Sequence, residues 1–372
     1  MSKNNSIQKL NSKRTSPSSN KVTNEVIPNK YNISNRNVNN NDQPGIIEVY
    51  EDNFIQELKN LSCLLDEYNY IGMDTEFPGT VFCVQNNNTD DFYFRTLKLN
   101  VDSLKLIQLG ITLTNSNGEF PKDYPYHTWQ FNFEFDQNKD QYSPASLNLL
   151  IQCGIDFNKL KRRGIKHKIF AEYFMISGLV LNPDIHWISF HGSYDFGYLL
   201  RLLLNKKLPD TEQEFINDLN DYFMNYYDIR ILVRGKDNLQ GGLNKLAQNL
   251  QVLREGKTHQ AGSDSVVTID VFFKLIENGT INKEKLPELK NIVFGIGQGE
   301  DNDETRNYYT KNGGLNYQNN NQNNLMFLAM NTPYMQYYYP QTINLMNGNN
   351  TNGNIRQAQN NNNYPQILEQ YI

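Results

Sequence analysis

The sequence predicts an α/β protein with a mixed sheet flanked by helices, and two features of residues 45–304 support this prediction. Stretches with apolar residues at helical spacing alternate with short apolar runs that resemble strands. Three strand-like runs also follow one another before the helical stretches resume. This order is typical of a mixed sheet covered by helices. The region of about 260 residues has the size of a single large domain.

The first half of this region contains one predicted helix and three predicted strands. The helix has four apolar residues at three- and four-residue spacing, which are Phe54, Leu58, Leu61 and Leu65. The strands are expected at residues 70–77, 105–115 and 127–133. An Asn-Gly pair within residues 116–120 predicts a tight turn between the last two. Three successive strands favour an antiparallel meander.

In the second half, helices are expected to outnumber strands. Ser143 and Pro144 predict the start of a helical stretch that runs in pieces from 143 to 178. Two further strands are expected at 186–192 and 226–232. The remaining helices are expected at 194–204, at about 242–249 and at 263–276.

Composition separates this region from two tails. Residues 1–44 are rich in Asn, Ser and Lys, and residues 305–372 in Asn, Gln and Tyr, so both are predicted to be disordered. The net charge of -5, from 35 basic and 40 acidic residues, argues against a generally basic nucleic-acid-binding surface. The sequence has no apolar signal segment and no apolar run of about 18 residues. We therefore expect a soluble protein that binds no membrane and is located in the cytoplasm, with the nucleus as a further location.

Four carboxylates stand where the predicted strands and helices meet. Asp74 and Glu76 are two positions apart on a strand, so their side chains share one face. Asp195 follows a strand and opens a helix, and Asp264 opens another helix. If these positions form one site, their charge of about -4 would be cancelled by two divalent ions.

Oxygen ligands favour Mg²⁺ or Mn²⁺ over zinc, because the chain has no Cys and His cluster that could form a tetrahedral site. Two such ions about 3.5 to 4 Å apart are the usual device for in-line displacement at a phosphodiester. His259 lies five residues before Asp264, and a loop ending at Gly262 would let it reach the site. Its ordinary pKa of about 6.5 suits a general base that activates water.

Each residue taken alone has a structural explanation. The Asp74 and Glu76 pair could be the solvated face of an edge strand, Asp195 and Asp264 could be helix caps, and His259 could be a loop histidine. The basic run at residues 159–168 is read as a solvated helix face and loop rather than as a nucleic-acid track. The four acids and the histidine in combination favour a site.

The sequence resembles the DEDD-type 3′-to-5′ exoribonucleases, and among them the Caf/Pop-type catalytic subunit of the Ccr-Not deadenylase complex. The matching stretches are MDTEFPG (73–79), LKLIQLG (104–110), TWQFNF (128–133), SFHGSYDFGYLL (189–200), GGL (241–243) and HQAGSDS (259–265). The resemblance implies an RNase H-like fold for residues 45–304 as a single catalytic domain. It also implies that Asp74, Glu76, Asp195 and Asp264 are metal ligands and that His259 is the base.

The resemblance further implies an activity and partners. The substrate would be the poly(A) tail of messenger RNA, shortened from its 3′ end with release of AMP. The partners would be the large Not scaffold subunit and a Ccr-type nuclease. Two alternatives remain open: the same chemistry on other RNA 3′ ends or single-stranded DNA, and a pseudoenzyme that serves as a binding platform.

Overall fold

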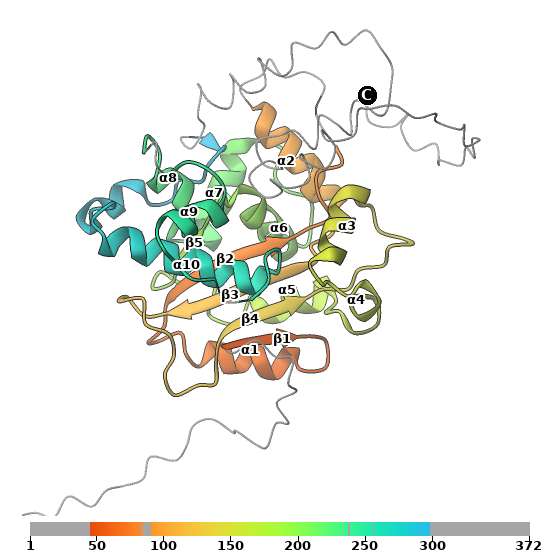
Figure 1. Cartoon of the computed structure of the whole chain (residues 1–372). Coiled ribbons are helices and arrows are strands. Elements are labelled where there is room, and N and C mark those ends of the chain that lie inside the picture. Colours follow the sequence, from red (N-terminus) through yellow and green to blue (C-terminus); the bar gives the residue numbers. More distant parts are fainter. Residues whose placement is uncertain (1–44, 83, 85–90, 237–238, 255, 298–372) are drawn as a thin grey trace, which may run out of the picture. The chain divides into compact units, whose positions relative to one another are not determined.

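In the computed structural model, a single mixed sheet organises the described residues, which are 45–82, 84, 91–236, 239–254 and 256–297. They belong to the second of two units into which the chain divides, Asn40–Ile372. The sheet order is β1-β4-β3-β2-β5-β6 (Figure 1). The strands are β1 (Gly45–Val49), β2 (Tyr70–Glu76), β3 (Gln108–Thr114), β4 (Tyr126–Asn132), β5 (His186–Ser189) and β6 (Tyr226–Asp228). The predictions for tails 1–44 and 305–372 concern residues outside this description.

Strand pairing places β2 near the middle of the sheet. Strands β2, β3 and β4 form the predicted antiparallel meander. Strand β5 pairs parallel with both β2 and β6, and β1 pairs parallel with β4. The predicted mixed sheet is confirmed. Because β2 has a partner on each side, Asp74 and Glu76 are not on an edge strand.

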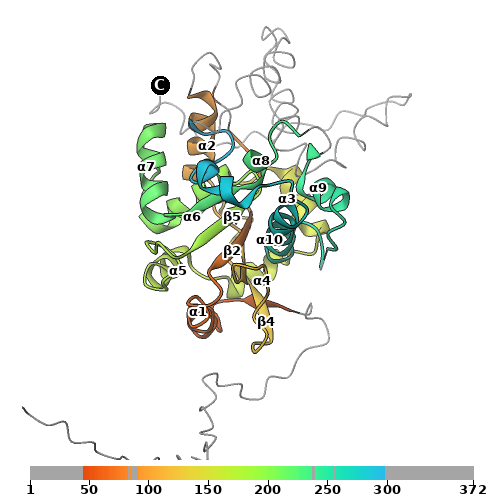
Figure 2. The same cartoon turned by 90° about the vertical axis from the view of Figure 1, so that its left-hand side faces the viewer.

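Helices cover both faces of the sheet. They are α1 (Phe54–Ser62), α2 (Phe92–Ser103), α3 (Pro144–Gln152), α4 (Phe157–Arg163), α5 (His167–Phe174), α6 (Ser193–Leu204), α7 (Glu212–Tyr222), α8 (Ile229–Leu232), α9 (Leu243–Asn249), α10 (Ala261–Glu277) and the 3₁₀ helix η2 (Lys283–Leu289). Figure 2 shows α6 and α10 on opposite faces, with β2 and β5 between them. No helix of the described part of the chain is long and apolar enough to cross a membrane.

Helix α10 packs directly on the sheet because two glycines make room for it. A side chain at Gly110 on β3 would overlap the Ala261 carbonyl oxygen, and one at Gly72 on β2 would lie 2.8 Å from Ile269. Apolar residues of α10, such as Phe272, then join the core between helix and sheet. Gly110 lies directly opposite Asp74 in the β2–β3 pairing. The start of α10 is therefore held beside the carboxylates of β2.

Among the predicted element boundaries that differ from the structure, two bear on the site. The strand expected at 226–232 ends at Asp228, and residues Ile229–Leu232 form the short helix α8. The loop expected to end at Gly262 is also shorter, because α10 already begins at Ala261. His259 still lies before the start of α10. The predicted approach of its side chain to the carboxylates therefore does not require a loop that extends to Gly262.

Candidate active site

The four predicted carboxylates are brought together by β2 and by the two helices that cover its opposite faces. Asp74 and Glu76 lie on the last part of β2, Asp195 in the first turn of α6, and Asp264 in the first turn of α10. Their residues are only 2%, 4%, 2% and 7% exposed, in the same order. The reading of Asp74 and Glu76 as a solvated face is therefore excluded. Four acids this deeply buried are uncommon unless something positive pairs with them.

Asp195 is tied to the strand that carries the first two acids. The Thr75 hydroxyl donates a hydrogen bond to Asp195 Oδ1. Thr75 lies between Asp74 and Glu76 in sequence, so its side chain points to the opposite face of the strand. This bond fixes α6 against the back of β2 and holds Asp195 near the other two acids.

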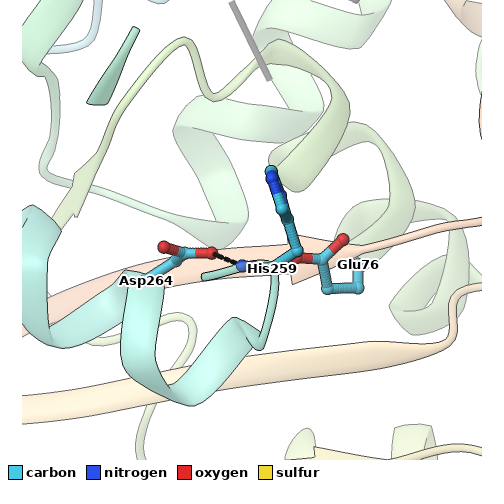
Figure 3. A group of neighbouring side chains, drawn as sticks. All are labelled: Glu76, His259 and Asp264. Carbon is cyan, nitrogen blue, oxygen red and sulfur yellow. Dashed lines mark hydrogen bonds between the residues drawn. The ribbon is translucent and has the colours of Figure 1, made fainter. Parts of the chain in front are cut away.

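Asp264 and His259 approach the same place from the start of α10. The backbone N–H of His259 donates to Asp264 Oδ2 at 2.9 Å. Oxygen atoms of Glu76 and Asp264 and a ring nitrogen of His259 all lie within 4.8 Å of one another. Figure 3 shows His259 between the two carboxylates. These three groups could hold one metal ion.

Burial, together with repulsion by neighbouring carboxylates, shifts Asp74, Glu76 and Asp195 toward their neutral forms. Desolvation raises the pKa of Asp74 and of Glu76 well above their ordinary values, and the neighbouring carboxylates raise both further. Desolvation raises the pKa of Asp195 to about 7, against the lowering effect of the Thr75 hydrogen bond. The cluster thus has more negative charge than its surroundings compensate, which is the electrostatic condition of a cation site.

His259 is shifted the other way. Burial lowers its pKa below 6.5, while the negative charge of Asp264 opposes the shift and the positive charge of Arg254 adds to it. The imidazole is therefore neutral at pH 7 and able to accept a proton. The backbone of His259 has a φ of 58°, in the left-handed region that favours glycine and asparagine. This strained conformation lets one residue place both its N–H and its ring at the site.

The start of α10 is positioned by glutamines that sequence reasoning missed. Gln108 Oε1 on β3 accepts from the N–H of Ala261 at 3.3 Å, and Gln130 Oε1 on β4 accepts from that of Gly262 at 2.9 Å. Gln130 also donates to the Gln260 side chain at 3.0 Å. These bonds satisfy N–H groups that the first turn of a helix leaves without partners. The available signal was a glutamine within each of two predicted strands.

Asp228 also positions a part of the site, the turn before α6, and this role was not predicted from the sequence. Its fully buried carboxylate accepts from the N–H groups of His191 at 2.8 Å and Gly192 at 3.0 Å, which form the turn before α6. It also accepts from the N–H groups of Arg230 at 2.9 Å and Phe294 at 3.0 Å. Asp228 therefore fixes the turn from which α6 presents Asp195. The sequence predicted Asp228 inside a continuous strand at 226–232, and that prediction did not indicate a role in holding the turn.

Residues 49–172 match the model of the CAF1 family ribonucleases. The Arabidopsis thaliana protein named probable CCR4-associated factor 1 homolog 7 is 45% identical over 260 residues, which span 68% of this chain and 93% of the relative. The chain belongs to the CAF1 family of ribonucleases.

Two further CAF1-type proteins agree with this assignment. Schizosaccharomyces pombe poly(A) ribonuclease pop2 is 40% identical over 68% of this chain and 75% of its own. The solved structure of S. pombe Pop2p in its Mg²⁺- and Mn²⁺-bound form matches with a TM-score of 0.64 and 38% identity, over 68% of this chain and all of that one. A yeast CAF1 co-crystallised with the NOT1 MIF4G domain matches with a TM-score of 0.57 and 29% identity, over 67% and 96% of the two chains. The expected RNase H-like fold is confirmed.

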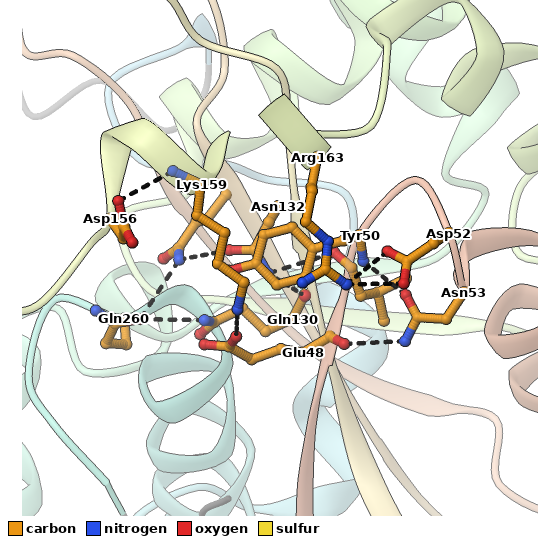
Figure 4. A network of polar contacts seen from close by, with 12 residues as sticks. Glu48, Tyr50, Asp52, Asn53, Gln130, Asn132, Asp156, Lys159, Arg163 and Gln260 are labelled. Atoms are coloured by element: carbon orange, nitrogen blue, oxygen red, sulfur yellow. Dashed lines mark hydrogen bonds and ion pairs between the residues drawn. The ribbon is translucent and has the colours of Figure 1, made fainter. Parts of the chain in front are cut away.

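The basic run of this CAF1 ribonuclease forms ion pairs with nearby acids rather than a track into the site. Lys159 pairs with Glu48 at 3.0 Å and Arg163 with Asp52 at 2.7 Å. Figure 4 shows these pairs next to the contacts of Gln130 with Gln260. Because the charges of Lys159 and Arg163 are matched by nearby acids, the reading of this run as a solvated helix face agrees with the structure.

The shifted pKa of Asp195 predicts a dependence of stability on pH. Because the folded-state pKa of about 7 lies above the ordinary 3.8, the favourable contribution of the protonated acid is complete below the unfolded value and is lost as pH rises through 7. In chelator, we expect the melting temperature of Asp195→Asn, relative to wild type, to rise between about pH 5 and pH 8. The exposed Asp66, changed to asparagine, serves as the control and should show no such trend. A difference that stays constant with pH would contradict the assignment.

Proposed function

We propose that this CAF1-family ribonuclease is a metal-dependent 3′-to-5′ exoribonuclease that shortens the poly(A) tails of messenger RNA and releases AMP. The observation that carries the proposal is the convergence of four buried carboxylates, whose summed charge exceeds that of Arg254, the arginine that pairs with Asp264. Poly(A) as substrate is supported by the name of the S. pombe relative, a poly(A) ribonuclease. The exonuclease direction is supported by the resemblance of the sequence motifs.

The donor set fits divalent cations. All four acids offer oxygen, the ligand that Mg²⁺ and Mn²⁺ prefer, and the related Pop2p structure is described as binding these two ions. Asp74, Glu76, Asp195 and Asp264 would hold two ions. When bound, such ions polarise a phosphodiester and lower the pKa of water, which supplies most of the chemistry of hydrolysis.

The chain's own residues have separate tasks in this proposal. His259 Nδ1 or Nε2 accepts the proton of the attacking water, because burial keeps the ring neutral at pH 7. The N–H of the same residue orients the Asp264 carboxylate. Thr75 orients Asp195 in the same way from the other side of β2.

The relatives support the proposed partners. The yeast CAF1 that matches this chain was crystallised with the NOT1 MIF4G domain, and the plant relative is named a CCR4-associated factor. This supports membership in a Ccr-Not complex, with contacts to the large Not scaffold and to a Ccr-type nuclease. The basic residues 159–168 are largely engaged in ion pairs, which favours recruitment to RNA by such partners. A cytoplasmic and nuclear location is part of the same proposal.

The test uses the full chain and an RNA labelled at its 5′ end, in which a mixed sequence is followed by a run of adenosines. With Mg²⁺ or Mn²⁺, we expect a ladder that shortens from the 3′ end, slows at the first base that is not adenine and disappears in chelator. Trimming that crosses this boundary at an unchanged rate would make the enzyme a general 3′ exonuclease. A folded protein that produces no ladder with either ion would instead be a binding platform.

A further inference from the structure

Arg254 inserts a positive charge into the carboxylate cluster. It comes from the segment between α9 and α10, and its side chain is only 18% exposed. Its Nη1 lies 2.6 Å from Asp264 Oδ1 and 3.1 Å from Ser263 Oγ, and its Nη2 donates to Asn244 Oδ1. The same positive charge lowers the pKa of Asp74 and of Glu76. The guanidinium therefore acts on most of the cluster and not on Asp264 alone.

The contacts of Asp264 place this guanidinium in conflict with a metal ion. Both carboxylate oxygens of Asp264 accept from residues of the preceding segment, Oδ1 from Arg254 and Oδ2 from the backbone N–H of His259. A carboxylate that binds a divalent ion must direct oxygen lone pairs at that ion. A cation held 2.6 Å from Oδ1 competes for those lone pairs and repels the incoming charge.

We propose that Arg254 is a built-in counterion of the carboxylate cluster, which competes with divalent metal for Asp264 and so weakens the chain's affinity for metal. The inference rests on the proposed metal-dependent function. It gives this arginine a role in positioning Asp264 and in setting the metal concentration at which the enzyme becomes active. While the arginine is in place, it also offsets the repulsion among the buried acids.

Two features allow the guanidinium to leave Asp264 without disturbing the helices. Its other partners, Asn244 Oδ1 and Ser263 Oγ, are neutral, so they can continue to hold the side chain beside the site. The segment also has left-handed backbone conformations at both ends, with φ of 58° at Gln251 and at His259. These two strained residues separate the segment from the regular geometry of α9 and α10.

The first test is calorimetric titration of Mn²⁺ into full-length protein stripped by chelator. We expect Arg254→Gln to bind Mn²⁺ about tenfold more tightly than wild type, which corresponds to about 1.4 kcal/mol. Arg254→Lys keeps the positive charge and should remain close to wild type. Arg163→Gln removes an arginine that pairs with Asp52 away from the cluster and should change nothing. Unchanged or weaker binding by Arg254→Gln would overturn the inference.

Thermal melts provide a second readout that a merely structural arginine would not reproduce. In chelator, Arg254→Gln should melt below wild type, because the acids lose their counterion. Saturating Mn²⁺ should close this gap, because the tighter-binding variant gains more stability from the ion. A gap that persists at saturation would show that the arginine only supports the fold, and would overturn the inference. If wild type binds no Mn²⁺ at all, the proposed function itself fails, which is distinguishable from equal binding by both proteins.

Discussion

Asp74→Asn is expected to abolish RNA hydrolysis while raising the melting temperature of the metal-stripped protein. The substitution removes one of the proposed metal ligands at almost constant side-chain volume. Metal ions supply several kcal/mol of transition-state stabilisation, so a loss of at least about 10³-fold in rate is expected. The stabilisation has a separate cause. Three neighbouring carboxylates raise the pKa of Asp74, which means that they repel its negative charge. Asparagine carries no charge, so this repulsion is absent in the variant.

Two measurements check this prediction. Single-turnover cleavage of a labelled RNA at saturating Mg²⁺ gives the rate, and thermal unfolding in chelator at about pH 8 gives the stability. Asp66→Asn, which removes an exposed carboxylate, controls for the change of net charge. Activity close to that of wild type would remove Asp74 from the set of ligands. A lower melting temperature would show that hydrogen bonding to Asp74 outweighs the repulsion.

The candidate site could be found from sequence because its residues conflict with their local context. Acids are rare in the interior of a strand as apolar as β2, and Asp195 and Asp264 each open a helix directly beside the sheet. Such a conflict between pattern and residue type is the expected mark of a functional position. The spacing itself could not show that α6 and α10 cover opposite faces of β2. That arrangement depends on the close approach of α10 at Gly72 and Gly110.

The wrong prediction of a strand at 226–232 has a structural cause. The run from Tyr226 to Leu232 is apolar enough for a strand, but the Asp228 carboxylate accepts from the N–H of Arg230 and turns the chain into α8. The Asp228 carboxylate also accepts a hydrogen bond from the N–H of Phe294, which is 66 residues away in the sequence. The residues around Asp228 therefore give no signal of this contact. Arg254 was not predicted as a site residue, because its role depends on its contact with Asp264, which the sequence does not show.

Helices α2 and α7 and strand β1 were not predicted, and neither was the 3₁₀ helix η2. Helix α7 does carry a start signal, since Thr211 accepts from the N–H of Glu214 at 3.3 Å as an N-cap. Helix α2 has no side-chain cap and follows residues outside the described part of the chain. Strand β1 is five residues long and pairs in parallel with the distant β4. Helix α7 could have been recognised from its cap, and helix α2 from Phe94, Leu97 and Val101, which recur at three- and four-residue spacing.

His259→Asn is expected to lower the rate of hydrolysis by a factor of about 100 at pH 8, with little change in the affinity for Mn²⁺. The imidazole is removed, while the backbone N–H that orients Asp264 Oδ2 remains. Asparagine is chosen because the φ of 58° at this position lies in a region that it tolerates better than most residues. Burial lowers the pKa of His259, so in wild type the imidazole is already in its neutral form at pH 8.

The same variant separates two roles that the geometry allows for His259. One of its ring nitrogens lies within 4.8 Å of carboxylate oxygens of both Glu76 and Asp264, so the ring could also be a metal ligand. A ligand role predicts a loss of Mn²⁺ affinity in calorimetry and a rate restored by raising the metal concentration. A base role predicts a low rate at every metal concentration. Gln251→Asn, at the other left-handed residue of the segment, controls for the backbone conformation and should retain full activity. An unchanged rate in His259→Asn would exclude both roles, because neither a base nor a ligand can be lost without cost to the reaction.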